Sequence, residues 1–268
     1  MNKLERRIKY TVLIITSVVS VFPLYWMAVS ATNKSVDILA GRLLPGSYIK
    51  DNFQNLLDMY NIGRAMTNSL RYSLLMTAAT LLICSLAGYG FEIYHDRVKD
   101  RLMSILLLAL MVPFVAILIP LFQMMSKYGL LNTSLGFMLP TISTPFMIML
   151  FRQNAKAFPY EIVEAARIDG CSELTIFIRF FIPTMRSAFA AAVIITFMNA
   201  WNSYLWPKVI MQTDESITMP ILVASIKDGY FTDYGVLMLA VMICTMPTIV
   251  FFFFLQKQFA EGIAGSVK

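Results

Sequence analysis

The residue types that most often carry out catalysis or bind metals are sparse in this chain and poorly spaced for either task. Its only cysteines and histidine are Cys84, Cys171, Cys244 and His95. Their spacing matches no metal motif, and such cysteines are most often small buried hydrophobic residues. Asp214 and Glu215 are adjacent in sequence, which places them poorly for joint acid and base catalysis. We therefore expect no metal site and no catalytic site, so the chain is predicted not to be an enzyme.

A more informative pattern lies in residues 158–170. Pro159 suits the first turn of a helix, and Glu161 is well placed against the positive end of the helix dipole. Gly170 suits a C-terminal stop. The segment therefore predicts a short helix, followed by a second amphipathic stretch over residues 172–182.

One face of this predicted helix is suited to contact another protein. Spacing of i, i+3, i+4 and i+7 places Glu161, Glu164, Ala165 and Ile168 on the same face. Ala165 and Ala166 are small, so a partner could approach the backbone closely. The alternative is a surface helix that lies at a membrane interface.

The rest of the chain is too apolar for a soluble protein. Of its 268 residues, 58% are hydrophobic and 14% are charged, against about 45–50% and 25% in soluble domains. This composition excludes a disordered chain, a nucleic-acid-binding module and an ordinary soluble enzyme. The net charge of +6 is better read as a sign of membrane topology.

Six apolar stretches are long enough to cross a bilayer. They are residues 10–31, 68–91, 102–126, 134–151, 183–206 and 232–255. The fourth is the shortest and contains Pro140 and Pro145, which are tolerated where neighbouring helices satisfy the backbone. The predicted fold is an all-α polytopic membrane protein with six transmembrane helices.

The distribution of lysine and arginine predicts the orientation. With the N-terminus in the cytoplasm, most of these residues lie in cytoplasmic segments, so both termini are expected inside. The first apolar run is too long for the core of a signal peptide and is expected to be retained. Residues 158–170 then lie in a cytoplasmic loop between spans four and five.

The predicted spans carry almost no charge in their interiors. Ion-coupled carriers usually have an acid or base within the membrane, and the chain has no Gly-rich phosphate loop ending in Gly-Lys-Ser/Thr. If this chain moves a solute uphill, another subunit must supply the energy.

The cytoplasmic loop resembles a known motif. Glu164-Ala165-Ala166-Arg167-Ile168-Asp169-Gly170, followed by Ile182-Pro183, resembles the EAA motif of permease subunits of ABC importers. Cys171 and Ile182 depart mildly from the usual Ala and Leu. Further resemblance to the maltose-type sugar permeases comes from Asn68-Ser69-Leu70, Gly88-Tyr89-Gly90-Phe91, Gly129-Leu130-Leu131-Asn132-Thr133 and Trp201-Asn202.

The resemblance implies a function and partners. In that family the EAA segment is a coupling helix that docks on a nucleotide-binding subunit. The implied coupling residues here are Glu161, Glu164, Ala165, Ala166, Asp169, Gly170 and Pro183. The resemblance implies no cofactor on this chain, with ATP and Mg on two partner ATPase subunits. It also implies a second permease, forming a heterodimer, and an extracytoplasmic sugar-binding protein, at the inner membrane of a prokaryote.

A candidate substrate pathway lies near the outer end of the fifth span. Aromatic faces stack on the C–H groups of sugars, and amides form hydrogen bonds with their hydroxyls. Asn199, Trp201, Asn202 and Tyr204 offer both kinds of contact. The alternatives are a helix–helix hydrogen bond for the two asparagines and an interfacial aromatic belt, which is favoured for Tyr204 and Trp206.

The resemblance also suggests roles for the remaining segments. Residues 1–66 are expected to hold the cytoplasmic N-terminus, the first span and an outer loop, and residues 67–268 the permease domain with the EAA loop and a short cytoplasmic tail. The outer segment 211–231 is expected to reach toward the binding protein, or else to be a solvated loop. Two other functions stay open: a stand-alone carrier or channel, and a membrane-embedded enzyme.

Overall fold

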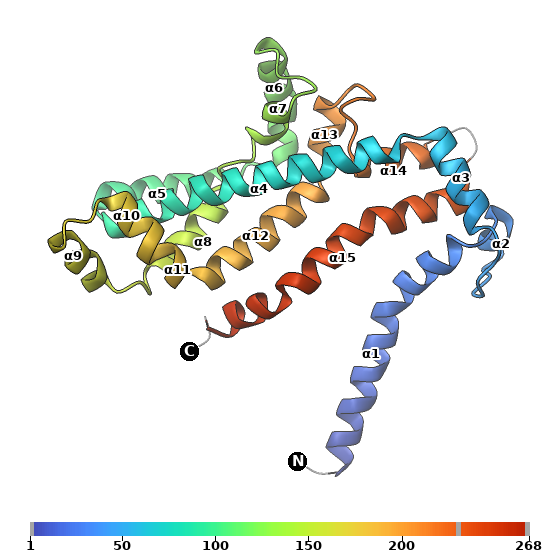
Figure 1. Cartoon of the computed structure of the whole chain (residues 1–268), viewed down its shortest axis with the longest axis horizontal. Coiled ribbons are helices and arrows are strands. Elements are labelled where there is room, and N and C mark those ends of the chain that lie inside the picture. The colour runs from blue at the N-terminus through green and yellow to red at the C-terminus, as the bar shows by residue number, and fades with distance from the viewer. Residues whose placement is uncertain (1–2, 229–231, 266–268) are drawn as a thin grey trace. The chain divides into compact units, whose positions relative to one another are not determined.

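Figure 1 shows the computed structural model of the chain, whose described residues are 3–228 and 232–265. Every regular element among them is a helix, which confirms the predicted all-α class. The chain divides into two compact units, Met1–Gly63 with Ile221–Pro247 and Arg64–Pro220 with Thr248–Lys268. The expected division between residues 66 and 67 stays a prediction.

The first unit contains the N-terminal helices and a pair of buried asparagines, Asn33 and Asn52. It contains α1 (Lys3–Ser30), α2 (Ser35–Leu39), α3 (Ile49–Met59), most of α14 (Met219–Lys227) and the first part of α15 (Tyr234–Gly265). The buried Asn52 donates from Nδ2 to the carbonyls of Ala31 and Asn33, at 2.9 and 3.0 Å. These bonds hold α3 against the end of α1. The outer loop expected after the first span is largely helical, since it contains α2, α3 and the start of α4.

The second unit contains the remaining helices. They are α4 (Ile62–Ile93), of which all but the first two residues belong here, α5 (Arg97–Ala109), α6 (Phe114–Lys127), α7 (Ser134–Met138), α8 (Pro145–Ala155), α9 (Tyr160–Ile168), α10 (Glu173–Ile176), the π-helix η1 (Phe177–Phe181), α11 (Ile182–Thr184), α12 (Arg186–Trp201) and α13 (Leu205–Ile210). Within this unit α9 and α10 lie at the end where α4 finishes and α5 begins (Figure 1).

The helices account for most of the predicted spans. Leu4–Ser30, Ile62–Ile93 and Tyr234–Phe254 are each long and apolar enough to cross a membrane. Two further pairs qualify if each bent pair is one span: α5 with α6, bent by 97°, and Glu173–Thr184 with α12, bent by 84°. The described residues thus give three spans, or up to five, against the six predicted.

The predicted fourth span, 134–151, is not one continuous helix. It is divided into α7, of five residues, and α8, of eleven. Pro145 begins α8, and the Thr144 hydroxyl accepts a hydrogen bond from the Met147 amide. A proline lacks the amide hydrogen that a continuing helix needs, and it disfavours helical backbone in the residue before it. The predicted fourth span is therefore divided into two helices at its prolines.

Close packing of α4 against α8 forms one of the buried clusters of the second unit. The buried side chains of Cys84, Met147, Phe151 and Ala192 meet there, from α4, α8 and α12. A Cβ atom at Gly88 would lie 2.5 Å from the Cβ of Phe151 and 2.8 Å from the Arg152 amide nitrogen. Only glycine permits this approach of the two helices. Cys84 packs as a buried hydrophobic residue, whereas Cys171 and Cys244 are partly exposed.

Candidate functional site

The helix predicted in residues 158–170 is present as α9. Pro159 is its N-cap, and Glu161 lies in its first turn. After the helix, Gly170 has a φ of +75°, its amide donates to the Arg167 carbonyl, and the Cys171 amide donates to Ala166. These two bonds make a Schellman motif, which explains why a glycine ends this helix.

The two faces of α9 have different surroundings. The exposed face carries Glu161, Glu164, Ala165 and Ile168, as their spacing predicts, and Asp169 and Gly170 are exposed beyond it. Val163 and Ala166 face inward and are 0% and 4% exposed. They pack in a cluster with Phe158, Phe177 and Phe181. Ala166 therefore contacts the chain's own core, and a partner would meet Ala165.

Arg167 fixes α9 to the next helix. Its Nε donates to Glu173 Oε1 at 2.7 Å, and its Nη1 donates to the Tyr160 hydroxyl at 3.2 Å. The guanidinium also lies over the Tyr94 ring, 5.7 Å from the centroid. The hydrogen bond to the Glu173 carboxylate raises the pKa of Arg167. Sequence reasoning missed this role, although a basic last turn followed by an acidic first turn signals such a bond.

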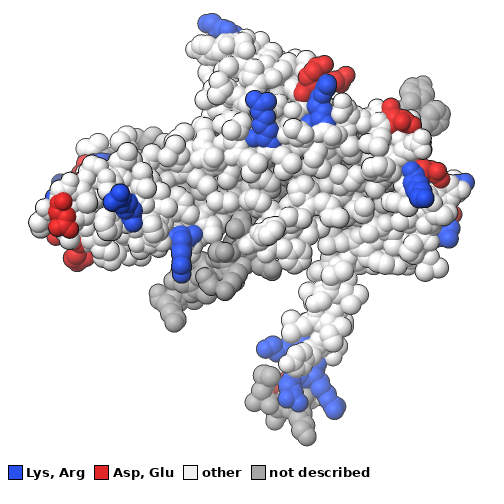
Figure 2. Space-filling model, in the orientation of Figure 1, with Lys and Arg blue, Asp and Glu red and all other residues white. Residues whose placement is uncertain are grey.

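A second charged cluster ties three helix ends together nearby. Arg152, at the end of α8, lies 3.3 Å from Glu92 of α4 and 2.5 Å from Asp100 of α5. Its side chain is only 9% exposed. His95 lies 3.0 Å from Asp100 on the surface side of this cluster. Figure 2 shows acidic and basic side chains gathered at the end of the unit that carries α9.

Pro183 lies at the joint between the α9 region and the long helix α12. It is exposed, within α11, and is followed by the buried Met185 at which α12 is bent from the preceding helical segment. The chain between α10 and α12 includes the π-helix η1. Pi-helical turns are rare and occur frequently at functional sites.

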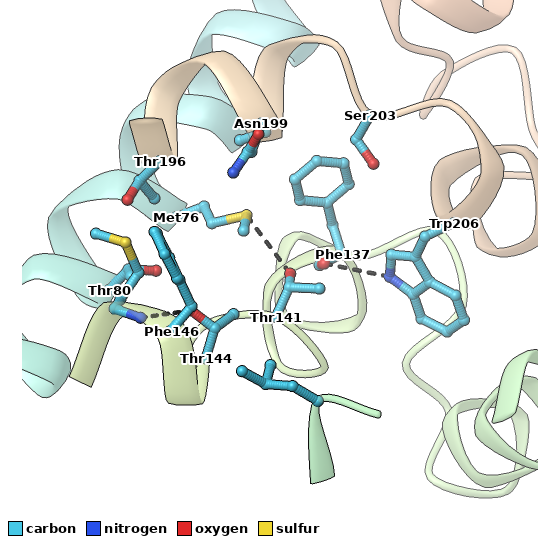
Figure 3. A pocket seen from close by; sticks show the side chains of 13 residues that line it. Met76, Thr80, Phe137, Thr141, Thr144, Phe146, Thr196, Asn199, Ser203 and Trp206 are labelled. Atoms are coloured by element: carbon cyan, nitrogen blue, oxygen red, sulfur yellow. Dashed lines mark hydrogen bonds between the residues drawn. The ribbon is translucent and has the colours of Figure 1, made fainter. Parts of the chain in front are cut away.

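A cavity of about 290 Å³ opens between α4, residues 137–147 and α12 (Figure 3). Its polar wall consists of Thr80, Thr141, Thr144, Thr196, Asn199 and Ser203. Of the four predicted pathway residues, only Asn199 lies on this wall. The threonines were not found from sequence, because a threonine in an apolar helix usually bonds to its own backbone and gives no signal.

The other three pathway candidates lie elsewhere. Trp201 is 1% exposed and stacks on Phe197, with ring centroids 5.9 Å apart. Asn202 is exposed and donates to the Met198 carbonyl of its own helix at 2.9 Å. Tyr204 is 40% exposed. The cavity wall therefore includes none of the three, and their place in a pathway stays a prediction.

Trp206 is buried rather than placed in the interfacial belt that the sequence favoured. It is 3% exposed and lines the cavity, and its Nε1 lies 3.1 Å from the Gly136 carbonyl and 3.2 Å from that of Phe137. These bonds satisfy the indole nitrogen inside the protein, so the ring needs no polar interface.

Three residues quoted for their family resemblance hold the outer segment in place. Asn132 has a φ of +59°, and its Oδ1 accepts hydrogen bonds from the amides of Gln212 and Thr213 and from the Ser216 hydroxyl. Asn68 Nδ2 donates to the carbonyls of Glu215 and Ile217, and Ser69 Oγ accepts from the Met219 amide. The described part of this segment is thus an ordered turn followed by α14, and residues 229–231 lie outside the described chain.

No three metal-ligating side chains come together in the described part of the chain.

Comparison with known proteins agrees with this architecture. Residues 80–265 match the family model described as "Binding-protein-dependent transport system inner membrane component". The chain is 41% identical to the lactose transport system permease protein LacG of Rhizobium radiobacter, over the full length of both. It is 32% identical to the arabinooligosaccharides transport system permease protein AraQ of Halalkalibacterium halodurans, covering 93% of this chain and 92% of the other.

More distant similarities extend over nearly the whole chain. It is 27% identical to the sn-glycerol-3-phosphate transport system permease protein UgpE of Escherichia coli O1:K1, covering 97% and 96% of the two chains. A crystal structure of a bacterial ABC transporter involved in the import of the acidic polysaccharide alginate has the same fold. The TM-score is 0.83 at 19% identity, covering 97% of this chain and 99% of that one.

Proposed function

This chain belongs to the family of binding-protein-dependent transport system inner membrane components, and from that premise we propose that it is a permease subunit of an ATP-driven ABC importer for a sugar or oligosaccharide. The observation that carries the proposal is the full-length similarity to a lactose permease subunit. The exposed face of α9 supports it, since an importer of this kind must receive force from a separate ATPase.

In this proposal α9 is the coupling helix. Glu164 is the principal polar contact with the ATPase, and Glu161 and Asp169 surround it. Ala165 and Gly170 permit close approach, because neither has a long side chain and a Cβ at Gly170 would meet no atom within 4 Å. Ala166 supports the helix from its buried side.

The bonds around Arg167 suit α9 to transmit motion. The Arg167–Glu173 pair joins α9 to α10, and the buried cluster with Phe177 and Phe181 joins it to η1. A force on the exposed face is therefore carried toward Pro183 and the bend at Met185, and from there into α12. Closing of the ATPase subunits would move α12 as a rigid body and switch the transporter between its outward-facing and inward-facing states.

The remaining functions of the proposed transporter belong to partner subunits. ATP and Mg bind to two ATPase subunits, since this sequence has no Gly-rich phosphate loop. A second permease completes the pathway as a heterodimer. The ordered outer segment around Asn132 contacts the extracytoplasmic binding protein. Both termini lie in the cytoplasm.

Purification from native membranes in mild detergent tests the proposal. The wild-type chain is expected to copurify with an ATPase and a second permease, and to show vanadate-sensitive ATP hydrolysis. The Glu164→Ala, Ala165→Leu double variant changes only exposed residues of α9 and is expected to insert normally and to lose both. Lys127→Ala, on exposed α6, is the matched surface control and retains both.

A stand-alone carrier is the function that a contrary result would favour. In that case the wild-type chain purifies alone, shows no associated ATPase activity and transports sugar into vesicles without ATP. Copurification that survives the double variant would instead refute the role of α9 while leaving the importer assignment intact.

A further inference from the structure

The wall of the cavity beside Asn199 includes two threonines whose hydroxyls have no hydrogen-bond partner among the described residues. Thr80 and Thr196 are 1% and 4% exposed, and neither Oγ1 has a hydrogen-bond partner among the described residues. A helical threonine ordinarily donates to the carbonyl four residues earlier. Thr77, on the same helix as Thr80, does so to Ser73 at 2.7 Å. Both oxygens are enclosed in this conformation. Because both residues line the cavity, a rotation about χ1 that exchanges Oγ1 with the methyl group would turn each unpartnered hydroxyl toward a ligand.

Other polar groups surround the same space. Thr196 and Asn199 project from α12, and Thr141 and Thr144 come from the opposite wall (Figure 3). The Asn199 amide and the Ser203 hydroxyl make no side-chain hydrogen bond within the described chain. Hydroxyls and an amide around one space match a ligand that both donates and accepts hydrogen bonds at several positions.

The cavity wall carries no charge. None of its described lining residues is Asp, Glu, Lys, Arg or His. A phosphate or carboxylate would lose its hydration there without gaining a partner ion, which is strongly unfavourable. The wall therefore favours an uncharged ligand, in contrast with the glycerol phosphate and acidic polysaccharide for which two of the similar proteins are named.

The size and the apolar part of the wall limit the ligand further. A volume of about 290 Å³ lies at the lower end of small-molecule sites, which begin at about 300 Å³. Phe137, Phe146 and Trp206 supply aromatic surface, and Trp206 is held by its two hydrogen bonds to the 136–137 backbone. One ring fits this space better than an oligosaccharide.

We propose that this cavity binds one uncharged sugar ring of the transported saccharide, with the Thr80 and Thr196 hydroxyls as its buried hydrogen-bonding groups. The inference rests on the proposed function and names the substrate class of its pathway. An oligosaccharide would then pass with one ring at a time in the cavity. The site would be on this chain, whichever sites the second permease adds.

The test uses the complete transporter reconstituted in proteoliposomes, with radiolabelled lactose and arabinotriose as neutral probes and glycerol 3-phosphate as the anionic probe. Thr80→Val and Thr196→Val remove one hydroxyl each at nearly constant volume. Thr77→Val is the matched control, because its hydroxyl is bonded to its own helix and lies outside the cavity wall. Removal of an unpaired hydroxyl is not expected to impair folding.

The wild-type complex is expected to take up a neutral probe. The KM for this probe should rise about 3- to 10-fold in each cavity variant, because each loses one neutral hydrogen bond to the sugar. The KM of Thr77→Val should not change. With the labelling of the native Cys171 and Cys244 subtracted by a wild-type control, Ser203→Cys should react with a thiol reagent more slowly in the presence of the transported sugar. That protection reports occupancy of the cavity, which a purely structural role of the hydroxyls would not produce.

Other results distinguish failure of the cavity site from failure of the proposed function. Wild-type uptake of a neutral sugar with unchanged KM in both cavity variants, or no protection at Ser203→Cys, overturns the cavity site and leaves the importer. Uptake of glycerol 3-phosphate alone also overturns it. Absence of any sugar-dependent uptake or ATP hydrolysis by the wild-type complex refutes the proposed function, and the cavity site with it.

Discussion

Two glycines on α4 provide a matched test of how closely this helix packs against α8. At Gly88, an added Cβ would lie 2.5 Å from the Phe151 Cβ and 2.8 Å from the Arg152 amide nitrogen. At Gly90, two residues later, it would meet no atom within 4 Å. Alanine at either position gains about 1 kcal/mol of helix propensity over glycine. The two substitutions therefore differ mainly in the contact with α8.

The expected free energies follow from these distances. Forcing a methyl group against α8 lowers the free energy of unfolding by about 1–3 kcal/mol, as overpacking does in other cores. The gain in helix propensity offsets about 1 kcal/mol of this loss. Gly88→Ala is therefore expected to be between neutral and destabilising by about 2 kcal/mol. Gly90→Ala is expected to stabilise by up to about 1 kcal/mol. The gap between the variants is thus about 1–3 kcal/mol.

Thermal unfolding of the purified complex in detergent measures this gap. For a chain of this size about 2–4 °C in Tm corresponds to 1 kcal/mol, so Gly88→Ala should unfold several degrees below Gly90→Ala. Gly88→Leu should fail to assemble, because a larger side chain has no space beside Phe151. Equal unfolding temperatures for the two alanine variants would refute the close approach of α4 and α8.

Further predictions concern the polar bonds of the second unit. Arg152→Met leaves the largely buried Glu92 without its cation, while Asp100 keeps His95. We expect a lower unfolding temperature, partly recovered by adding Glu92→Gln. Trp206→Phe removes the buried indole donor from two carbonyls and should cost about 1–3 kcal/mol in the same assay, whereas Tyr204→Phe should have little effect. Asn132→Gly removes the oxygen that accepts hydrogen bonds from Gln212, Thr213 and Ser216, so protease cleavage within residues 211–217 should increase. Asn132→Asp keeps an acceptor and should protect the segment. Equal cleavage of the two variants would contradict the role of Asn132.

The sequence was most informative where the structure is local. The bounds and faces of α9 follow from Pro159, Glu161, the i, i+3, i+4, i+7 pattern and Gly170, all of which act within a few residues. The all-α class and the long spans follow from apolar runs. These features depend little on the rest of the fold.

The sequence predicts least well where contacts between distant residues decide the structure. The sequence favours an interfacial position for Trp206, whereas its buried indole donates to the carbonyls of Gly136 and Phe137, about 70 residues away in sequence. The cavity threonines come from three separate segments, and nothing in any one of them marks a shared space. Pro140 and Pro145 lie in the divided segment 134–151, but prolines alone do not predict a break there, because membrane helices tolerate them where neighbouring helices satisfy the backbone.

The internal bonds of α9 have a consequence for how the transporter assembles. Its cap, its Schellman motif and its bond to Glu173 are all made within this chain, so the exposed face is ordered before any partner arrives. Docking then loses little conformational entropy, since no segment must fold on binding. With α9 in its proposed role as the docking helix, we expect the heat capacity change on binding of an ATPase subunit to be that of two rigid surfaces.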